Sequence, residues 1–73
     1  MGYVLISRKG CHLCEEAEAL LEAQGIVYTL QDVDADENLR KLYTFRVPVL
    51  LWEGQVLLEG KFTQERLSKK LSL

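Results

Sequence analysis

The sequence predicts one α/β domain, in which three helices flank a four-stranded mixed sheet in the order β-α-β-α-β-β-α. Two observations predict this class. Short apolar runs of strand length alternate with segments whose apolar residues recur at helical spacing, and the last two such runs are joined by a two-residue turn. A helix between the first two strands makes them parallel, whereas a tight turn makes the last two antiparallel. Residues 1–73 are expected to form a single compact domain.

The first half of the chain reads as strand, helix and strand. Residues 3–6 are a short apolar run with two β-branched residues, which indicates a buried strand. From residue 12 the spacing is that of an amphipathic helix, which should end at Gly25. Its apolar stripe is expected to comprise Leu13, Ala17, Leu20, Leu21 and Gln24. Residues 26–30 are rich in β-branched and aromatic side chains and predict the second strand.

A short second helix is predicted over residues 35–43. Asp34 is placed to cap it, with Glu37 three residues later as in a capping box. The side chains expected to face inward are those of Leu39, Leu42 and Tyr43. The helix should stop before Val47-Pro48, because the residue before a proline avoids the helical conformation.

The last third of the chain predicts a hairpin followed by a helix. Residues 49–52 and 55–58 are apolar runs separated by Glu53-Gly54, which is typical of a two-residue β-hairpin turn. Thr63 is placed to cap a final helix over residues 64–71. That helix should pack two side chains on the sheet, Leu67 and Leu71.

Composition and charge exclude several classes of protein. The net charge is −2 with both signs interspersed, so there is no basic surface of the kind that binds nucleic acid. The apolar run near the N-terminus is too short for a signal-peptide core or a membrane span. We therefore expect a soluble, cytoplasmic protein that contacts neither nucleic acid nor a membrane.

Both cysteines of the chain, Cys11 and Cys14, lie in one Cys-x-x-Cys motif between the first strand and the first helix. A disulfide between them would close a very small loop and remove little entropy from the unfolded chain, so it is a poor structural staple. In a reducing compartment such a pair is catalytic or binds metal. A closed four-ligand zinc site would need His12 and a carboxylate such as Glu15 besides both thiols. We therefore expect a redox dithiol and no bound metal.

Cys11 has the surroundings that a nucleophilic thiolate needs. It lies at the N-terminus of the predicted helix, where unpaired backbone N–H groups and the helix dipole favour an anion. Arg8 and Lys9 precede it within one turn, and protonated His12 would add to the same effect. The two glutamates that follow the motif oppose it. Arg8 and Lys9 would also attract anionic thiol substrates.

Cys14 lies one helical turn further on, on the side of the helix shared with Ala17 and Leu21. We expect its side chain to be less exposed than that of Cys11 and its pKa to be raised, which suits the second step of an exchange reaction. In that reaction Cys11 attacks a substrate disulfide, and Cys14 then attacks Cys11 and releases the reduced substrate.

The motif at the first strand-to-helix turn, Val47-Pro48 before the third strand, the Glu53-Gly54 hairpin and Gly60 after the last strand together resemble the small glutaredoxin-like proteins. The resemblance covers nearly the whole chain. It implies a minimal thioredoxin fold with the sheet order second, first, third, fourth strand, and a cis peptide bond before Pro48. It also implies that the backbone of Val47 pairs with the substrate. The candidate substrate-binding residues are Arg8, Lys9, His12, Val47, Pro48 and Gly60.

Two departures from the glutaredoxin pattern bear on the reductant. His12-Leu13 stands between the cysteines, where glutaredoxins usually have Pro-Tyr. After the last strand the chain reads Gly60-Lys61-Phe62-Thr63-Gln64, without the Gly-Gly and Asp that hold the amine end of glutathione in the family. This second departure argues against glutathione as the dedicated reductant.

The sequence thus favours a monomeric dithiol–disulfide oxidoreductase without a cofactor, with Cys11 as nucleophile and Cys14 as resolving thiol. Its substrates would be disulfides of proteins or small molecules, and glutathione or a thioredoxin reductase would regenerate it. Two other classes stay open. One is an iron–sulfur or metal carrier that uses Cys11 at an interface between two chains, and the other is a binding module in which the dithiol is a regulatory switch.

Overall fold

The protein is described here by a computed structural model that covers residues 2–71. Its elements are β1 (Tyr3–Ser7), α1 (His12–Ala23), β2 (Tyr28–Asp32), the 3-10 turn η1 (Val33–Ala35), α2 (Glu37–Tyr43), β3 (Val49–Trp52), β4 (Gln55–Glu59) and α3 (Gln64–Leu71). The predicted order of strands and helices is confirmed, and η1 is an addition to it. The hairpin turn is also confirmed: Glu53 and Gly54 both have positive φ, 52° and 81°, as a type I′ turn requires.

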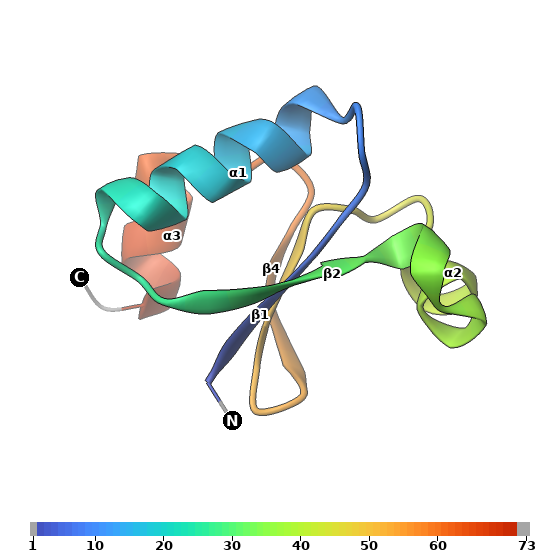
Figure 1. The fold of residues 1–73 in the computed structure, drawn as a ribbon. Coiled ribbons are helices and arrows are strands. Elements are labelled where there is room, and N and C mark those ends of the chain that lie inside the picture. Colours follow the sequence, from blue (N-terminus) through green and yellow to red (C-terminus); the bar gives the residue numbers. More distant parts are fainter. Residues whose placement is uncertain (1, 72–73) are drawn as a thin grey trace.

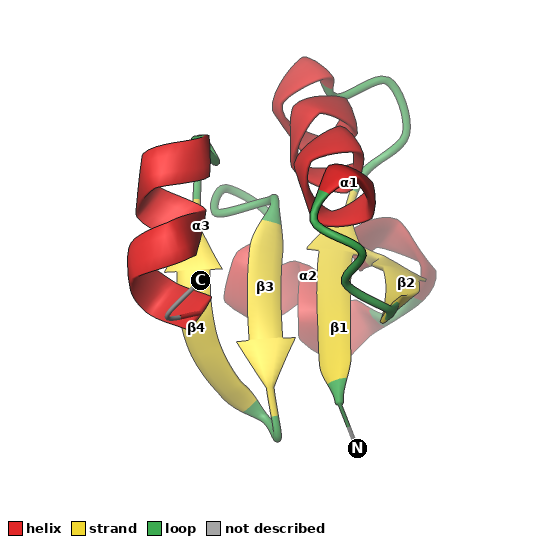
Figure 2. Ribbon diagram, turned by 90° about the vertical axis from the view of Figure 1, so that its left-hand side faces the viewer, coloured by secondary structure: helices red, strands yellow, loops and turns green. Residues whose placement is uncertain are grey.

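The four strands form one mixed sheet in the order β2-β1-β3-β4. β1 pairs in parallel with β2 and antiparallel with β3, and β3 pairs antiparallel with β4. Helices α1 and α3 cover one face of the sheet and α2 lies against the other (Figures 1 and 2). This is the three-layer arrangement of the thioredoxin fold, and it confirms the strand order that the resemblance implied.

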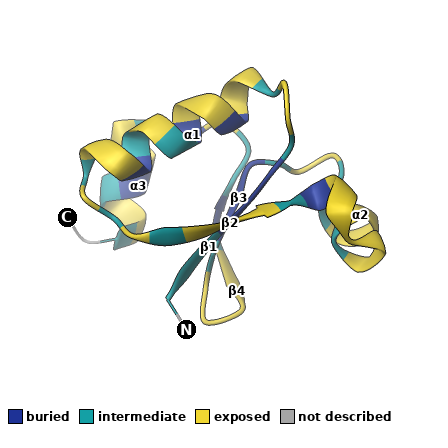
Figure 3. Cartoon of the chain, in the orientation of Figure 1, coloured by how far each residue is buried: buried dark blue, intermediate teal, exposed yellow. Residues whose placement is uncertain are grey.

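Alternate residues of each strand face opposite layers, so the sheet has two separate apolar clusters. The main core fills the layer of α1 and α3 and comprises Leu5, Ala17, Leu21, Leu50, Leu58, Phe62 and Leu67. Leu71 packs against it while partly buried, so both predicted contacts of α3 are confirmed. The cluster on the α2 side is smaller and comprises Ile6, Val33 and Val49. Helix α2 itself has no fully buried residue, as its colouring in Figure 3 shows.

The second strand was predicted two residues too early. β2 begins at Tyr28, which is the residue that pairs with Tyr3 of β1. Of the two apolar residues before it, Ile26 packs against the main core and Val27 is 88% exposed in the loop. The apolar run therefore marks where the chain approaches the core, whereas pairing with β1 sets where the strand begins.

The predicted cap of the second helix was also wrong. Asp36 caps α2, and its Oδ1 accepts the N–H groups of Asn38 and Leu39 at 2.7 and 3.1 Å. Asp34 lies one turn earlier, inside η1. Of the side chains predicted to face inward, those of Leu39 and Tyr43 pack on the smaller cluster, but Leu42 is 57% exposed.

Leu13 was predicted to lie on the buried stripe of α1, and it is instead 37% exposed. The buried residues of this helix are Cys14, Ala17 and Leu21. Ala17 and Leu21 are thus buried as predicted and Leu20 packs against the core, whereas Cys14 takes the buried place that was expected for Leu13.

Candidate dithiol site

Cys11 occupies the N-cap position of α1. Its backbone is extended, with φ −99° and ψ 112°, and its Sγ accepts the backbone N–H of Cys14 at 3.2 Å. Its carbonyl oxygen accepts the N–H of Glu15 at 3.0 Å, which begins the helix. The sulfur thus takes the place of the side-chain oxygen that usually caps a helix, and it lies at the positive end of the helix dipole. The side chain is partly exposed, so this sulfur can be reached from solvent.

Cys14 is also an unpaired thiol, but it is 1% exposed and belongs to the buried side of α1. Burial is the main cause that raises its pKa to about 12, and its hydrogen bond with the Cys11 sulfur adds to the effect. The backbone N–H of Arg8 acts in the opposite direction. The prediction that Cys14 is buried and has a raised pKa is confirmed.

The loop before β3 lies next to the end of β1. The Val47–Pro48 peptide bond is cis, as the resemblance implied, and Pro48 is buried. Val49 follows it and pairs with Ile6, two residues before Arg8, so this loop and the turn that carries Cys11 leave the same end of the sheet. The N–H of Val47 donates to the carbonyl oxygen of Tyr43 at 3.2 Å, within the protein.

Gly60 holds this loop from the side of β4. Its N–H donates to the carbonyl oxygen of Pro48 at 3.0 Å and to that of Arg46 at 3.3 Å. The side chain of Arg46 in turn pairs with Glu59, with its Nε 3.0 Å from Oε2. The N–H of Gly60 is therefore engaged within the protein.

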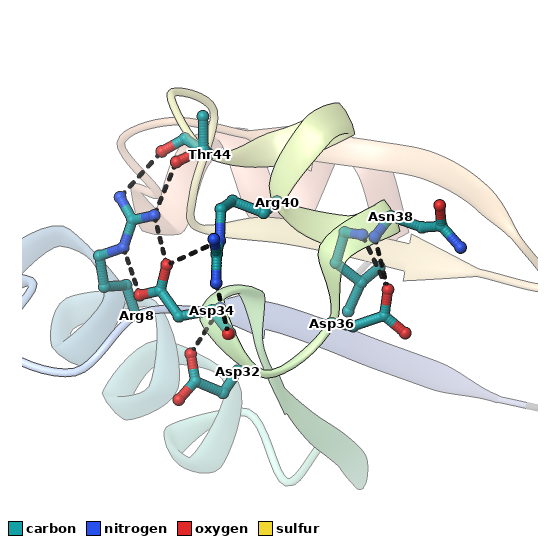
Figure 4. Close-up of polar contacts among 8 residues, drawn as sticks. Arg8, Asp32, Asp34, Asp36, Asn38, Arg40 and Thr44 are labelled. Carbon is teal, nitrogen blue, oxygen red and sulfur yellow. Dashed lines mark hydrogen bonds and ion pairs between the residues drawn. The ribbon is translucent and has the colours of Figure 1, made fainter.

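Arg8 also contacts the protein itself. Its Nε and Nη2 donate to the two carboxylate oxygens of Asp34 at 2.8 and 2.9 Å, which is the paired geometry that guanidinium groups prefer. Its Nη1 donates to the carbonyl oxygen of Thr44 at 3.0 Å and its Nη2 to the hydroxyl at 2.7 Å (Figure 4). Arg8 thus joins the turn before Cys11 to η1 and to the loop that leads to Pro48.

Asp34 and Thr44 also belong to this group of contacts, although the sequence does not point to them. Asp34 had a local explanation as a helix cap, and Thr44 carries no motif. Arg8 holds the pKa of the Asp34 carboxyl below its ordinary range, and Arg40 adds to this from α2, with its Nε 3.8 Å from Oδ1. Asp34 and Thr44 lie 26 and 36 positions from Arg8 along the chain, so no local sequence pattern could have predicted these contacts.

The remaining predicted residues, Lys9 and His12, are exposed on either side of Cys11. One apolar side chain is also unusually accessible: Phe45, directly after Thr44, is 97% exposed. Phe45 lies in the loop that leads from α2 to Pro48, and Arg8 binds its neighbour Thr44. Lys9 and His12 thus flank Cys11 in the sequence with exposed side chains, and Phe45 is exposed on a separate loop.

Between residues 2 and 71, no group of three or more His, Cys, Asp or Glu side chains is placed to hold a metal ion. Across the same range, no helix has both the length and the apolar character needed to cross a membrane.

Comparison with protein families gives one match that spans almost the whole chain. Residues 3–72 match the family described as glutaredoxin-like domain (DUF836). No curated protein is similar to the chain.

Solved structures give the same result. Target protein XcR50 from X. campestris is 33% identical, with a TM-score of 0.85 over 96% of this chain and 95% of that chain. Protein Ne2328 from Nitrosomonas europaea is 31% identical, with a TM-score of 0.77 over 93% of this chain and 87% of that chain. A glutaredoxin from Archaeoglobus fulgidus has a TM-score of 0.72 over 97% of this chain and 87% of that chain, and its 17% identity shows likeness of fold alone.

Proposed function

The chain belongs to the glutaredoxin-like domain family (DUF836) of the thioredoxin-fold superfamily, and from this membership we propose that it is a dithiol–disulfide oxidoreductase. The observation that carries the proposal is the contrast between its thiols. Cys11 is accessible at a helix N-terminus, and Cys14 is buried one turn away with its pKa raised to about 12. Exchange through a mixed disulfide needs such a pair, with one thiol to attack and another held back.

The first step uses Cys11. Its thiolate attacks one sulfur of a substrate disulfide, the substrate S–S bond breaks, and the other substrate sulfur leaves as a thiolate that takes up a proton. A mixed disulfide between Cys11 and the substrate results. The N–H of Cys14, which donates to the Cys11 sulfur at 3.2 Å, supports the thiolate before the attack.

The second step uses Cys14. Its thiol gives up its proton and attacks the Cys11 sulfur, the mixed disulfide breaks, and the substrate leaves as its second thiol. Two electrons have then passed from the protein to the substrate, and Cys11 and Cys14 are joined by a disulfide. Because Cys14 is held protonated at neutral pH, Cys11 is the thiol that attacks the substrate first, and Cys14 acts only in the second step.

The exposed surface around Cys11 suggests the kind of substrate. Lys9 and His12 suit an acidic or anionic partner, and the exposed ring of Phe45 suits an apolar side chain of a polypeptide. The engaged N–H of Gly60 and the engaged side chain of Arg8 leave fewer groups for glutathione. We therefore propose a protein disulfide as substrate, a monomeric enzyme in the reducing cytoplasm, and a thioredoxin reductase as a better candidate than glutathione for the reductant.

A trapping experiment tests the function. The Cys14→Ser variant, mixed with a disulfide-bonded peptide, should accumulate a covalent adduct at Cys11 that mass spectrometry detects and dithiothreitol removes. The Cys11→Ser variant is the matched control and should form no adduct. The wild-type protein should show a reversible two-electron transition at a potential between about −180 and −270 mV.

One outcome of the trapping experiment would contradict the exchange mechanism. If Cys14→Ser is folded by circular dichroism and its Cys11 reacts with iodoacetamide, yet no adduct forms with any disulfide tested, the exchange mechanism is wrong. Iron-dependent visible absorbance of the purified protein, with dimerisation, would then favour the carrier of an iron–sulfur cluster.

A further inference from the structure

The side chain of Phe45 is 97% exposed, more than any other aromatic side chain between residues 2 and 71. It lies on a well-defined turn that extends α2 towards β3. The N–H groups of Arg46 and Val47 both donate to the carbonyl oxygen of Tyr43, at 2.8 and 3.2 Å. The ring is therefore held out into solvent by an ordered, helix-like backbone.

The backbone on both sides of Phe45 is fixed by contacts with other elements. On one side, Arg8 donates to the carbonyl oxygen and the hydroxyl of Thr44 at 3.0 and 2.7 Å (Figure 4). On the other side, the Arg46 guanidinium pairs with Glu59 at the end of β4, with its Nε 3.0 Å from Oε2. A side chain on such a backbone loses little further freedom when a partner covers it, so it is preorganised for binding.

Two further exposed side chains lie on the same side of this turn. Leu42 and Lys41 precede Phe45 by three and four residues, which places side chains next to one another on a helical turn. Leu42 is 57% exposed, and Lys41 is exposed as well. None of the ion pairs in the described part of the chain involves Lys41. These three residues, here called the Phe45 patch, thus combine an apolar centre with an unpaired positive charge.

The Phe45 patch lies at the end of the sheet that carries the dithiol. The loop before β3 and the turn before α1 leave the same end of the sheet. Arg8, which binds Thr44, precedes Cys11 by three residues. The path from Cys11 through Arg8 and Thr44 to Phe45 is therefore no longer than an extended segment of roughly eight residues. A polypeptide can span this distance, whereas a small disulfide cannot.

We propose that the Phe45 patch is the docking surface for a polypeptide substrate of the dithiol, which it recognises by an apolar side chain flanked by acidic residues. The proposal rests on the exchange function and names the class of its substrate. The apolar side chain of the partner covers Phe45 and Leu42 and removes their surface from water. The carboxylates of the partner face Lys41.

The test measures how fast Cys11 captures three probes in the full chain carrying Cys14→Ser. Each probe holds thionitrobenzoate in a disulfide with its single cysteine. When the Cys11 thiolate attacks the cysteine sulfur, that disulfide breaks and the coloured thiolate leaves. The first probe is a peptide with Glu-Leu-Glu roughly eight residues from its cysteine. The second has Lys-Leu-Lys in the same place, and the third is cysteine alone.

Adding Phe45→Ser should lower the rate of capture of the Glu-Leu-Glu peptide about five- to thirtyfold, the size expected for losing a central aromatic contact. It should leave unchanged both the capture of the cysteine probe and the alkylation of Cys11 by iodoacetamide. Lys41→Gln should lower the rate for the Glu-Leu-Glu peptide about twofold, because the charge is exposed, and should raise the rate for the Lys-Leu-Lys peptide.

Val27→Ser is the matched control, since it also replaces an exposed apolar side chain by serine. Val27 is 88% exposed and precedes β2, whose first residue pairs with the first residue of β1. It therefore lies at the end of the sheet opposite to Cys11. Val27→Ser should leave all three capture rates unchanged, and circular dichroism should show that both serine variants are folded.

Four results would overturn the proposal. The first is an equal rate for the Glu-Leu-Glu peptide with and without Phe45→Ser. The second is a loss that extends to the cysteine probe, because Phe45 would then act on Cys11 itself. The third is a dimer in gel filtration that Phe45→Ser makes monomeric, because a second copy of the chain would then cover the patch. The fourth is that no probe releases thionitrobenzoate although iodoacetamide alkylates Cys11, and this result alone would reject the exchange function too.

Discussion

The two faces of the sheet are held in different ways. The face under α1 and α3 is closed by a continuous apolar core that includes Leu21 and Phe62. The other face has a small cluster, and α2 contributes no fully buried residue to it. Polar contacts dominate there: Arg8 binds Asp34 and Thr44, and Asp36 caps the helix (Figure 4). The dithiol lies where the two regions meet.

The two faces of the sheet therefore contribute unequally to the free energy of folding. Apolar burial on the α1 and α3 face supplies most of the free energy of folding, whereas exposed ion pairs contribute little. Contacts on the α2 face can therefore be changed while the fold stays intact. Three measurements test this difference between the two faces.

The largest effect is expected from a leucine truncated in each layer. Leu21→Ala in α1 should lower the free energy of unfolding by about 2–5 kcal/mol, because Leu21 is fully buried. Leu39→Ala in α2 should lower it by roughly 1–2 kcal/mol, because Leu39 is only partly buried. Urea denaturation followed by circular dichroism measures both. Equal losses would contradict the difference between the faces.

The second largest effect on stability is expected at high pH and comes from the buried thiol of Cys14. The pKa of Cys14 is raised in the folded protein to about 12 from an ordinary value of 9.0, so its protonated form is favoured by folding. The stability this contributes is full below the ordinary pKa and is lost as the pH rises from there through the folded value. The reduced wild type should therefore lose stability faster than Cys14→Ala as the pH rises from about 9 towards 12. Parallel curves would place Cys14 outside the core.

The smallest effect is expected at low pH on the α2 face. The pKa of Asp34 is lowered by its pairing with Arg8, so its charged form is favoured by folding. This contribution is present above the ordinary carboxyl pKa of about 4 and is lost as the pH falls through the lowered value. Any stability difference between wild type and Asp34→Asn should shrink to zero in that range, as thermal unfolding at a series of pH values can show. A difference that grows in acid would mean that Asp34 is not charged in the folded protein.

The sequence was sufficient to predict every strand and every α-helix, because each has a local signal. The hairpin was the clearest, with a turn whose two residues adopt positive φ. The start of β2 could not be predicted in this way, because it depends on which residue pairs with Tyr3. The cap of α2 could not be predicted in this way either: Asp34 was chosen, but Asp32, Asp34 and Asp36 stand at alternate positions, and residue type does not distinguish them. Asp32 caps η1 and Asp36 caps α2, while Asp34 binds Arg8.

The same distinction between local signals and long-range contacts applies to the candidate site. Cys11 and Cys14 were identified from one motif, and the burial of Cys14 followed from helical spacing. Arg8 and Gly60 were predicted as substrate ligands because of their place in the chain, and this stays a prediction. The structure adds that the Arg8 guanidinium and the Gly60 N–H bind the loop around Thr44 and Pro48. Such contacts arise only when three distant segments fold together, so no local pattern can reveal them.

The strand order also has a consequence for synthesis. β1, both cysteines and β2 are complete by residue 32, whereas β3, which pairs with the other edge of β1, ends at Trp52. At the usual rate of translation the growing chain waits roughly one to a few seconds before that edge can be covered. During this interval the edge of β1 that later pairs with β3 is open to neighbouring chains. Aggregation through that edge is therefore a greater hazard for the growing chain than for the finished protein.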